Sequence, residues 1–201
     1  MCKELVRKNI RLKDYNYSQL GEYFVTICTK DRENLLGMVV DEKMILSKAG
    51  EITEKCWLEI PNHFPNVGLD VHQIMPNHIH GVIRILGDDG RGVQLNAPTR
   101  KNKNYFSNIS PKKNTLSVII RTFKGAVKTI CNQNNLDFFW QRSFYDHIIR
   151  TEKSYSNIYD YIQLNVGCWQ EDLENSEFKT QLKEKEREEK LKKHYKDLFN
   201  F

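Results

Sequence analysis

Two histidines separated by one residue open an apolar run, and this feature constrains the fold of the chain most strongly. The segment reads Met75-Pro76-Asn77-His78-Ile79-His80-Gly81-Val82-Ile83-Arg84-Ile85. Side chains i and i+2 of a β-strand point to the same face, with their Cα atoms about 6–7 Å apart. A strand here would aim both imidazoles at one point, which is half of a metal site on a rigid element. The alternative is a pair of packed or surface histidines on a half-buried strand.

The segments around the histidines predict an antiparallel sheet with helices packed on it. Runs of β-branched and aromatic residues predict extended segments at 23–29, 36–40, 43–46, 66–75, 78–85 and, as two short pieces, 138–150. We predict helices at 47–60, ended by Pro61, at 115–132, where apolar residues have helical spacing, and at 151–165, which Thr151 can cap. This order of elements predicts an α+β fold.

The length and composition predict one domain with an extension. The 201 residues are enough to bury a core, and we expect a domain over 10–170, a basic flexible loop at 87–114 and a charged helical extension at 171–201. The five cysteines are scattered, which favours a reduced, cytoplasmic setting. No apolar run has the length of a membrane span. The net charge of +5 permits a polyanionic partner.

The helix predicted over 151–165 carries a tyrosine outside its apolar stripe. The stripe is formed by Tyr155, Ile158, Tyr159, Ile162 and Val166. Tyr161 lies roughly 120° from the centre of that stripe, so we expect it to face outward. Asn165 follows one turn later on the same side. Tyr145, in an extended segment, is the alternative reactive tyrosine.

These groups together suggest phosphodiester chemistry. The imidazoles of His78 and His80 with the amide oxygen of Asn165 would make a three-ligand site that suits Mg²⁺ or Mn²⁺ better than structural zinc. Such a cation can polarise a phosphodiester oxygen. The phenol of Tyr161, with a reference pKa of about 10, could attack phosphorus once its ionised form is favoured. The resulting phosphotyrosine would conserve the bond energy for rejoining.

Other polar side chains have less specific interpretations. Arg121, Lys124 and Lys128 share one flank of the helix predicted over 115–132, where they would contact phosphates or remain solvated. His72 and His147 lie on predicted strands. We expect His72 to lie at the surface or to support the ligands of the site, and His147 to have a core or surface role.

Four motifs in this order resemble the REP-associated tyrosine transposases, within the single-tyrosine HUH transposases of bacterial insertion sequences. The resemblance spans roughly residues 10–170. Its motifs are Tyr17-Ser18-Gln19 with the segment 21–29, the segment 75–82 around the histidine pair, the segment 140–150, and Tyr161-Ile162-Gln163-Leu164-Asn165. Val166 departs from the pattern, because the family usually has proline there.

The resemblance implies a ferredoxin-like sheet and cutting of single-stranded DNA beside a hairpin through a 5′-phosphotyrosine. It implies that Tyr161 is the nucleophile and that His78, His80 and Asn165 bind a divalent metal. We also expect DNA contacts from Arg121, Lys124, Lys128 and Arg142, in a monomer or a homodimer. Two alternatives remain open: a domesticated protein that binds hairpin DNA or RNA without cutting, and a small zinc hydrolase.

Overall fold

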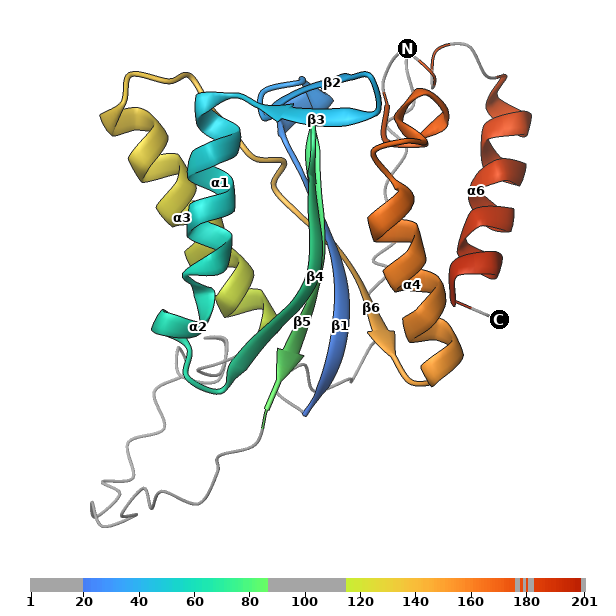
Figure 1. Cartoon of the computed structure of the whole chain (residues 1–201), viewed down its shortest axis with the longest axis horizontal. Helices are drawn as coiled ribbons and strands as arrows, with labels where there is room; N and C mark the ends of the chain where they lie inside the picture. The colour runs from blue at the N-terminus through green and yellow to red at the C-terminus, as the bar shows by residue number, and fades with distance from the viewer. Residues whose placement is uncertain (1–19, 87–114, 176–177, 179, 181–182, 200–201) are drawn as a thin grey trace, which may run out of the picture.

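A four-stranded antiparallel sheet forms the centre of the molecule. The structure is a computed structural model that describes residues 20–86, 115–175, 178, 180 and 183–199. The strand order is β4-β5-β1-β6 (Figure 1). The strands are β1 (Gly21–Cys28), β4 (Val67–Met75), β5 (His78–Ile85) and β6 (Tyr145–Ile149). A separate hairpin pairs β2 (Gly37–Val40) with β3 (Lys43–Leu46).

The connections between these strands are those of a ferredoxin-like sheet. Helices α1 (Lys48–Leu58) and α2 (Ile60–His63) lie between β1 and β4 in the chain, and α3 (Leu116–Gln133) lies between β5 and β6. Every pairing in the sheet is antiparallel, with β1 and β5 in the middle. The predicted α+β class is confirmed.

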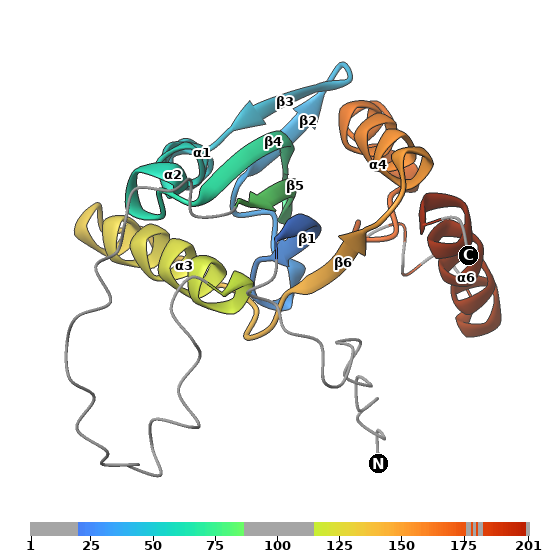
Figure 2. The same cartoon turned by 90° about the horizontal axis from the view of Figure 1, so that it is seen from below.

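One face of the sheet packs on α1 and α3 and forms the larger core. Alternation along β1 turns Tyr23, Val25 and Ile27 to this face, where all three are fully buried. Trp57 of α1 and Phe123 of α3 meet edge to face over it, with ring centroids 5.4 Å apart. The two views in Figures 1 and 2 show both helices on this side of the sheet.

The opposite face is covered by α4 (Glu152–Leu164) and α6 (Glu184–Phe199) (Figure 2). Its apolar cluster is smaller and contains residues from the sheet, α4 and α6: Phe24, Val71, Val82, Ile149, Ile158, Ile162, Leu198 and Phe199. The predicted charged C-terminal helix is therefore present, and its last turn packs on the domain. No helix among the described residues is both long and apolar enough to span a membrane.

The helix starts follow from capping. Ser47, Thr115 and Thr151 precede α1, α3 and α4, and each side chain accepts a hydrogen bond from a backbone N–H three residues later. In the short hairpin, Asp41 and Glu42 both have positive φ, of 48° and 58°, as a two-residue type I′ turn requires.

Several predicted boundaries differ from the structure. The first helix ends at Leu58, and Pro61 does not stop it but lies in the first turn of α2, where its missing N–H is harmless. Of the two extended pieces predicted over 138–150, one is β6, and the other is reduced to an isolated bridge between Thr29 and Trp140. The predicted loop at 87–114 and Tyr17-Ser18-Gln19 lie outside the described residues.

Candidate metal and tyrosine site

His78 and His80 lie on the face of β5 that is covered by α4 and α6. Their side chains are 0% and 2% exposed, and their ring centroids are 4.3 Å apart. Ile79 points to the opposite core, where it is fully buried. Strand alternation therefore brings both imidazoles to one point, as the His-x-His spacing predicts.

Neighbouring side chains fix how each imidazole is presented. Asn77 Oδ1 lies 2.8 Å from Nδ1 of His78, while its Nδ2 donates to the carbonyl oxygens of Arg32 and Glu174. Because Oδ1 can only accept, Nδ1 of His78 carries the proton and the lone pair is on Nε2. Thr26, paired with His80 across the β1–β5 register, places its Oγ1 2.9 Å from Nδ1 of His80.

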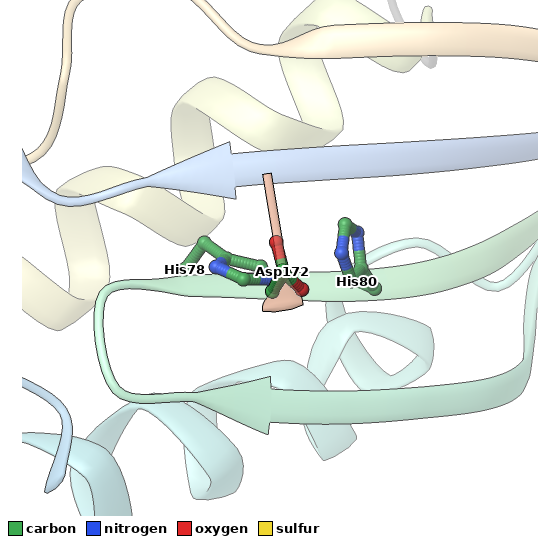
Figure 3. Close-up of side chains that lie close together, drawn as sticks. All are labelled: His78, His80 and Asp172. Carbon is green, nitrogen blue, oxygen red and sulfur yellow. The ribbon is translucent and has the colours of Figure 1, made fainter. Parts of the chain in front are cut away.

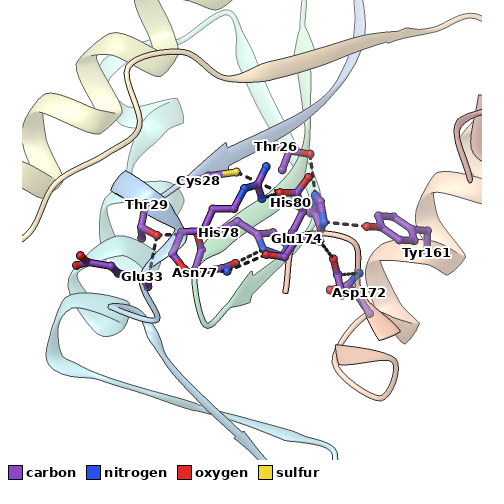
Figure 4. A network of polar contacts seen from close by, with 12 residues as sticks. Thr26, Cys28, Thr29, Glu33, Asn77, His78, His80, Tyr161, Asp172 and Glu174 are labelled. Carbon is purple, nitrogen blue, oxygen red and sulfur yellow. Dashed lines mark hydrogen bonds and ion pairs between the residues drawn. The ribbon is translucent and has the colours of Figure 1, made fainter. Parts of the chain in front are cut away.

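Tyr161 meets the histidine pair from α4 (Figure 4). Its hydroxyl oxygen is 3.1 Å from Nε2 of His80, and the two ring centroids are 5.1 Å apart. The ring of Phe24 packs edge-on against the same phenol. The structure thus brings together two residues that are 81 positions apart in the sequence.

The predicted outward direction of Tyr161 is wrong. The most buried positions of α4 are Ser154, Ile158 and Ile162, and Tyr161 is half-buried beside them. Tyr159, predicted to pack, is instead 40% exposed. The apolar stripe predicts the wrong direction because α4 is covered on two sides, by the sheet and by α6. The ring of Tyr161, which lies beside the stripe, is therefore also enclosed.

The site contains a carboxylate that the sequence analysis missed. Asp172 follows η3 (Trp169–Glu171), and its ligand atom lies within 4.8 Å of those of His78 and His80 (Figure 3). Asp172 is 7% exposed, and its Oδ2 accepts a 2.8 Å hydrogen bond from Nδ2 of Asn165. No local pattern marks this aspartate, because only the turn after α4 returns it to the sheet.

The donor set fits a divalent cation. Asn165 is 2% exposed, and its Oδ1 has no hydrogen-bond partner among the described residues. A buried acceptor without a donor is costly, and a cation would relieve that cost. Two imidazoles, an amide oxygen and a carboxylate are mixed nitrogen and oxygen ligands, which suit Mn²⁺ or Mg²⁺. His78, His80, Asp172 and Asn165 are the residues that could hold it.

Burial controls the charge state of these groups. It lowers the pKa of His80 well below its usual value, and the neighbouring His78 lowers it further. A neutral imidazole is the form that binds metals. Burial and then the charge of Asp172 raise the pKa of Tyr161 well above 10, while a hydrogen bond from Asn165 acts in the opposite direction. Without a cation the phenol is therefore protonated at neutral pH.

Helix α6 closes the site on the side of Tyr161. The ring centroid of His194 lies 4.9 Å from that of Tyr161. These two residues line a small cavity of about 30 Å³, together with Leu191, Tyr195 and Leu198 of α6. That volume has room for about one or two water molecules.

The other candidate residues lie outside the cluster of ligands. His72 packs near Trp57 on the other face of the sheet, with ring centroids 5.9 Å apart. His147 stacks on Phe199 at 3.6 Å. Tyr145, the alternative reactive tyrosine, lines the small cavity, and burial raises the pKa of its hydroxyl.

Two of the four predicted DNA-binding cations have structural partners. Lys124 donates from Nζ to the carbonyl oxygen of Gln141, and Lys128 donates to that of Phe138 at 2.8 Å. Both lie on α3, which packs on the sheet face away from the histidines. Arg121 and Arg142 are exposed. DNA binding by these four residues stays a prediction.

The fold is similar to that of solved structures. The structure is similar to that of a REP-associated tyrosine transposase bound to a REP hairpin, with a TM-score of 0.50 and 18% identity, covering 78% of this chain and 72% of that one. This likeness shows that the chain has the α+β fold of that transposase. A putative transposase of Deinococcus radiodurans aligns with a TM-score of 0.41 and 14% identity over 76% of this chain and 95% of its own.

Sequence comparison gives the family. An uncharacterized protein of Haemophilus influenzae is 42% identical over 171 residues, which are 83% of this chain and 91% of that protein. The chain belongs to the family of this protein. No protein-family model matches the sequence.

Proposed function

We propose that the protein is a metal-dependent transposase-like enzyme that nicks and rejoins single-stranded DNA near a hairpin, with Tyr161 as the nucleophile. The observation that carries the proposal is the approach of the Tyr161 hydroxyl to 3.1 Å from Nε2 of His80, inside the buried cluster of His78, His80 and Asp172. The REP-associated transposase that shares the fold was solved with a REP hairpin, which supports a hairpin-bearing substrate.

The proposed reaction is an exchange of one phosphoester for another. The phenolic oxygen of Tyr161 attacks phosphorus, the bond between phosphorus and the 3′-oxygen breaks, and a 5′-phosphotyrosine forms. The phenolic proton is released, and the leaving 3′-oxygen takes up a proton. Attack by a 3′-hydroxyl on the phosphotyrosine reverses these changes, restores Tyr161 and joins a strand.

The cation would be held by His78, His80 and Asp172, with Asn165 as a further oxygen ligand. When bound, a divalent metal polarises a phosphodiester oxygen and stabilises developing charge. An imidazole nitrogen has one lone pair, so Nε2 of His80 cannot accept the hydrogen bond of Tyr161 and bind a cation together. Metal loading would therefore release the phenol from His80.

The test is the formation of a protein–DNA adduct that survives denaturation. The protein is incubated with hairpin-bearing single strands and Mn²⁺, and Tyr161→Phe is the matched control because it removes only the hydroxyl. The proposal expects an adduct with the parent protein and none with Tyr161→Phe or His80→Ala. An adduct that persists in Tyr161→Phe would contradict the role of this tyrosine. Binding without an adduct under any metal would instead support a hairpin-binding protein that does not cut.

A further inference from the structure

A cleft lies beside the site, between the end of β1 and the segment that precedes β6. Lys30, Asp31 and Arg32 of η1 (Lys30–Arg32) form one wall, and Trp140, Gln141 and Arg142 form the other. The cleft has a volume of about 480 Å³, which lies within the range of ligand sites in proteins.

Backbone hydrogen bonds hold the two walls at a fixed separation. The N–H of Lys30 donates to the carbonyl oxygen of Phe139 at 2.8 Å, and the N–H of Gln141 donates to that of Cys28 at 2.9 Å. Lys124 of α3 also donates to the carbonyl oxygen of Gln141. The side chains that line the cleft therefore project from a rigid frame.

The charges and rings of the cleft match a single nucleic-acid strand. The side chain of Lys30 is 62% exposed, and its ion pair with Asp31 is long, at 3.9 Å. Arg142 is also exposed. Next to the cleft, Phe139 is 45% exposed, with Nζ of Lys30 5.6 Å and Nζ of Lys128 3.1 Å from its ring centroid. Cations that contact phosphates and an exposed ring on which a base stacks are the features with which proteins bind single strands.

The cleft is joined directly to the histidine site. Arg32 forms an ion pair with Glu174, two residues after Asp172. Asn77, which fixes His78, donates to the carbonyl oxygens of Arg32 and Glu174 at 3.2 and 2.9 Å. The buried side-chain amide of Asn77 therefore contacts both the wall of the cleft, at Arg32, and the imidazole of His78.

We propose that this cleft holds single-stranded DNA next to the cleaved phosphodiester, with phosphates on Lys30 and Arg142 and a base against Phe139. This inference rests on the proposed function and adds the path of the strand. It assigns DNA contacts to Lys30 and Phe139, and it gives Arg142 a place in the path, while Lys124 and Lys128 support the wall.

The test measures binding of a fluorescein-labelled oligodeoxythymidylate of 15 nucleotides by anisotropy over a range of salt concentrations. All proteins carry Tyr161→Phe, and EDTA is present, so that cutting does not contribute. In Lys30→Gln/Arg142→Gln, two phosphate contacts are lost, and the slope of log K against log salt falls by about 1.4. Phe139→Leu weakens binding about fivefold or more, the loss of one stacked base.

The matched control is Lys55→Gln/Lys153→Gln, which removes the same charge from exposed positions on α1 and α4. It should retain the parental slope. An equal fall in both double variants, or an unchanged slope in Lys30→Gln/Arg142→Gln, would overturn the proposal. Circular dichroism checks that each variant is folded. The adduct assay with Tyr161 intact tests cutting separately, so the strand path and the chemistry can fail independently.

Discussion

The contact between Phe199 and His147 gives a prediction with a measurable size. The two rings stack with centroids 3.6 Å apart at an angle of 13°. Phe199 is 5% exposed and belongs to the last turn of α6, so this contact anchors that helix to β6. Burial, followed by the charge of Arg150, lowers the pKa of His147 from 6.5 to about 4.

We predict that Phe199→Ala raises the pKa of His147 from about 4 toward its ordinary value of 6.5, because the imidazole ring regains contact with water. The assay is an NMR titration of the ring protons, assigned with His147→Gln. Phe139→Ala, which removes an exposed phenylalanine from the segment before β6, is the control and should leave the pKa of His147 near 4. A value near 4 in Phe199→Ala would show that Phe199 is not the source of the burial.

The same pKa predicts how stability depends on pH. Since folding lowers the pKa of His147, the unfolded chain binds a proton more readily than the folded chain. The contribution of His147 to the free energy of unfolding is therefore complete above pH 6.5. It is lost as the pH falls from 6.5 to about 4. The difference corresponds to about 3 kcal/mol, which partial exposure of the ring reduces to roughly 1–2 kcal/mol. Urea unfolding should show this loss in the parent protein and less of it in Phe199→Ala.

Three further predictions concern packing and the support of the site. Gly81→Ala places a Cβ 2.4 Å from Cζ2 of the fully buried Trp57, so urea unfolding should show a loss of about 1–3 kcal/mol; an unchanged midpoint would contradict the packing. Gly125→Ala, at a helical position where an added Cβ meets no other part of the described structure within 4 Å, should instead stabilise by about 0.5–1 kcal/mol in the same assay, and a loss would count against an open surface there. Asn77→Ala removes the partner of His78, so calorimetry should show Mn²⁺ affinity about 10–100-fold weaker; unchanged affinity would rule out this support.

Local patterns were sufficient to predict the framework of the site. Strand periodicity predicts that His78 and His80 share a face, and the structure has this arrangement, with Cys28 and Thr26 of β1 paired opposite them. The bounds predicted for helix α3, 115–132, agree with the structure within one residue at each end. These features depend on neighbours in the chain, which the sequence displays directly.

Features that depend on distant segments were not predictable in this way. The stripe of α4 gave the wrong direction for Tyr161, because part of its cover comes from α6, a separate helix that follows later in the chain and places His194 against the phenol ring. Asp172 has no periodic context, and its place beside the histidines results from the return of the chain after η3. The helical pattern does not show that the carbonyl oxygens of Phe138 and Gln141, in a later segment, accept hydrogen bonds from Lys128 and Lys124.

The polar cluster draws its members from four separated stretches: β1, the start of β5, the end of α4 and the turn that carries Asp172. Contacts of such long sequence separation form late, since the chain must first close large loops. A nascent or proteolysed chain that stops before residue 172 cannot present the full set of donor atoms. A chain without this aspartate would therefore lack part of the donor set that could hold a cation.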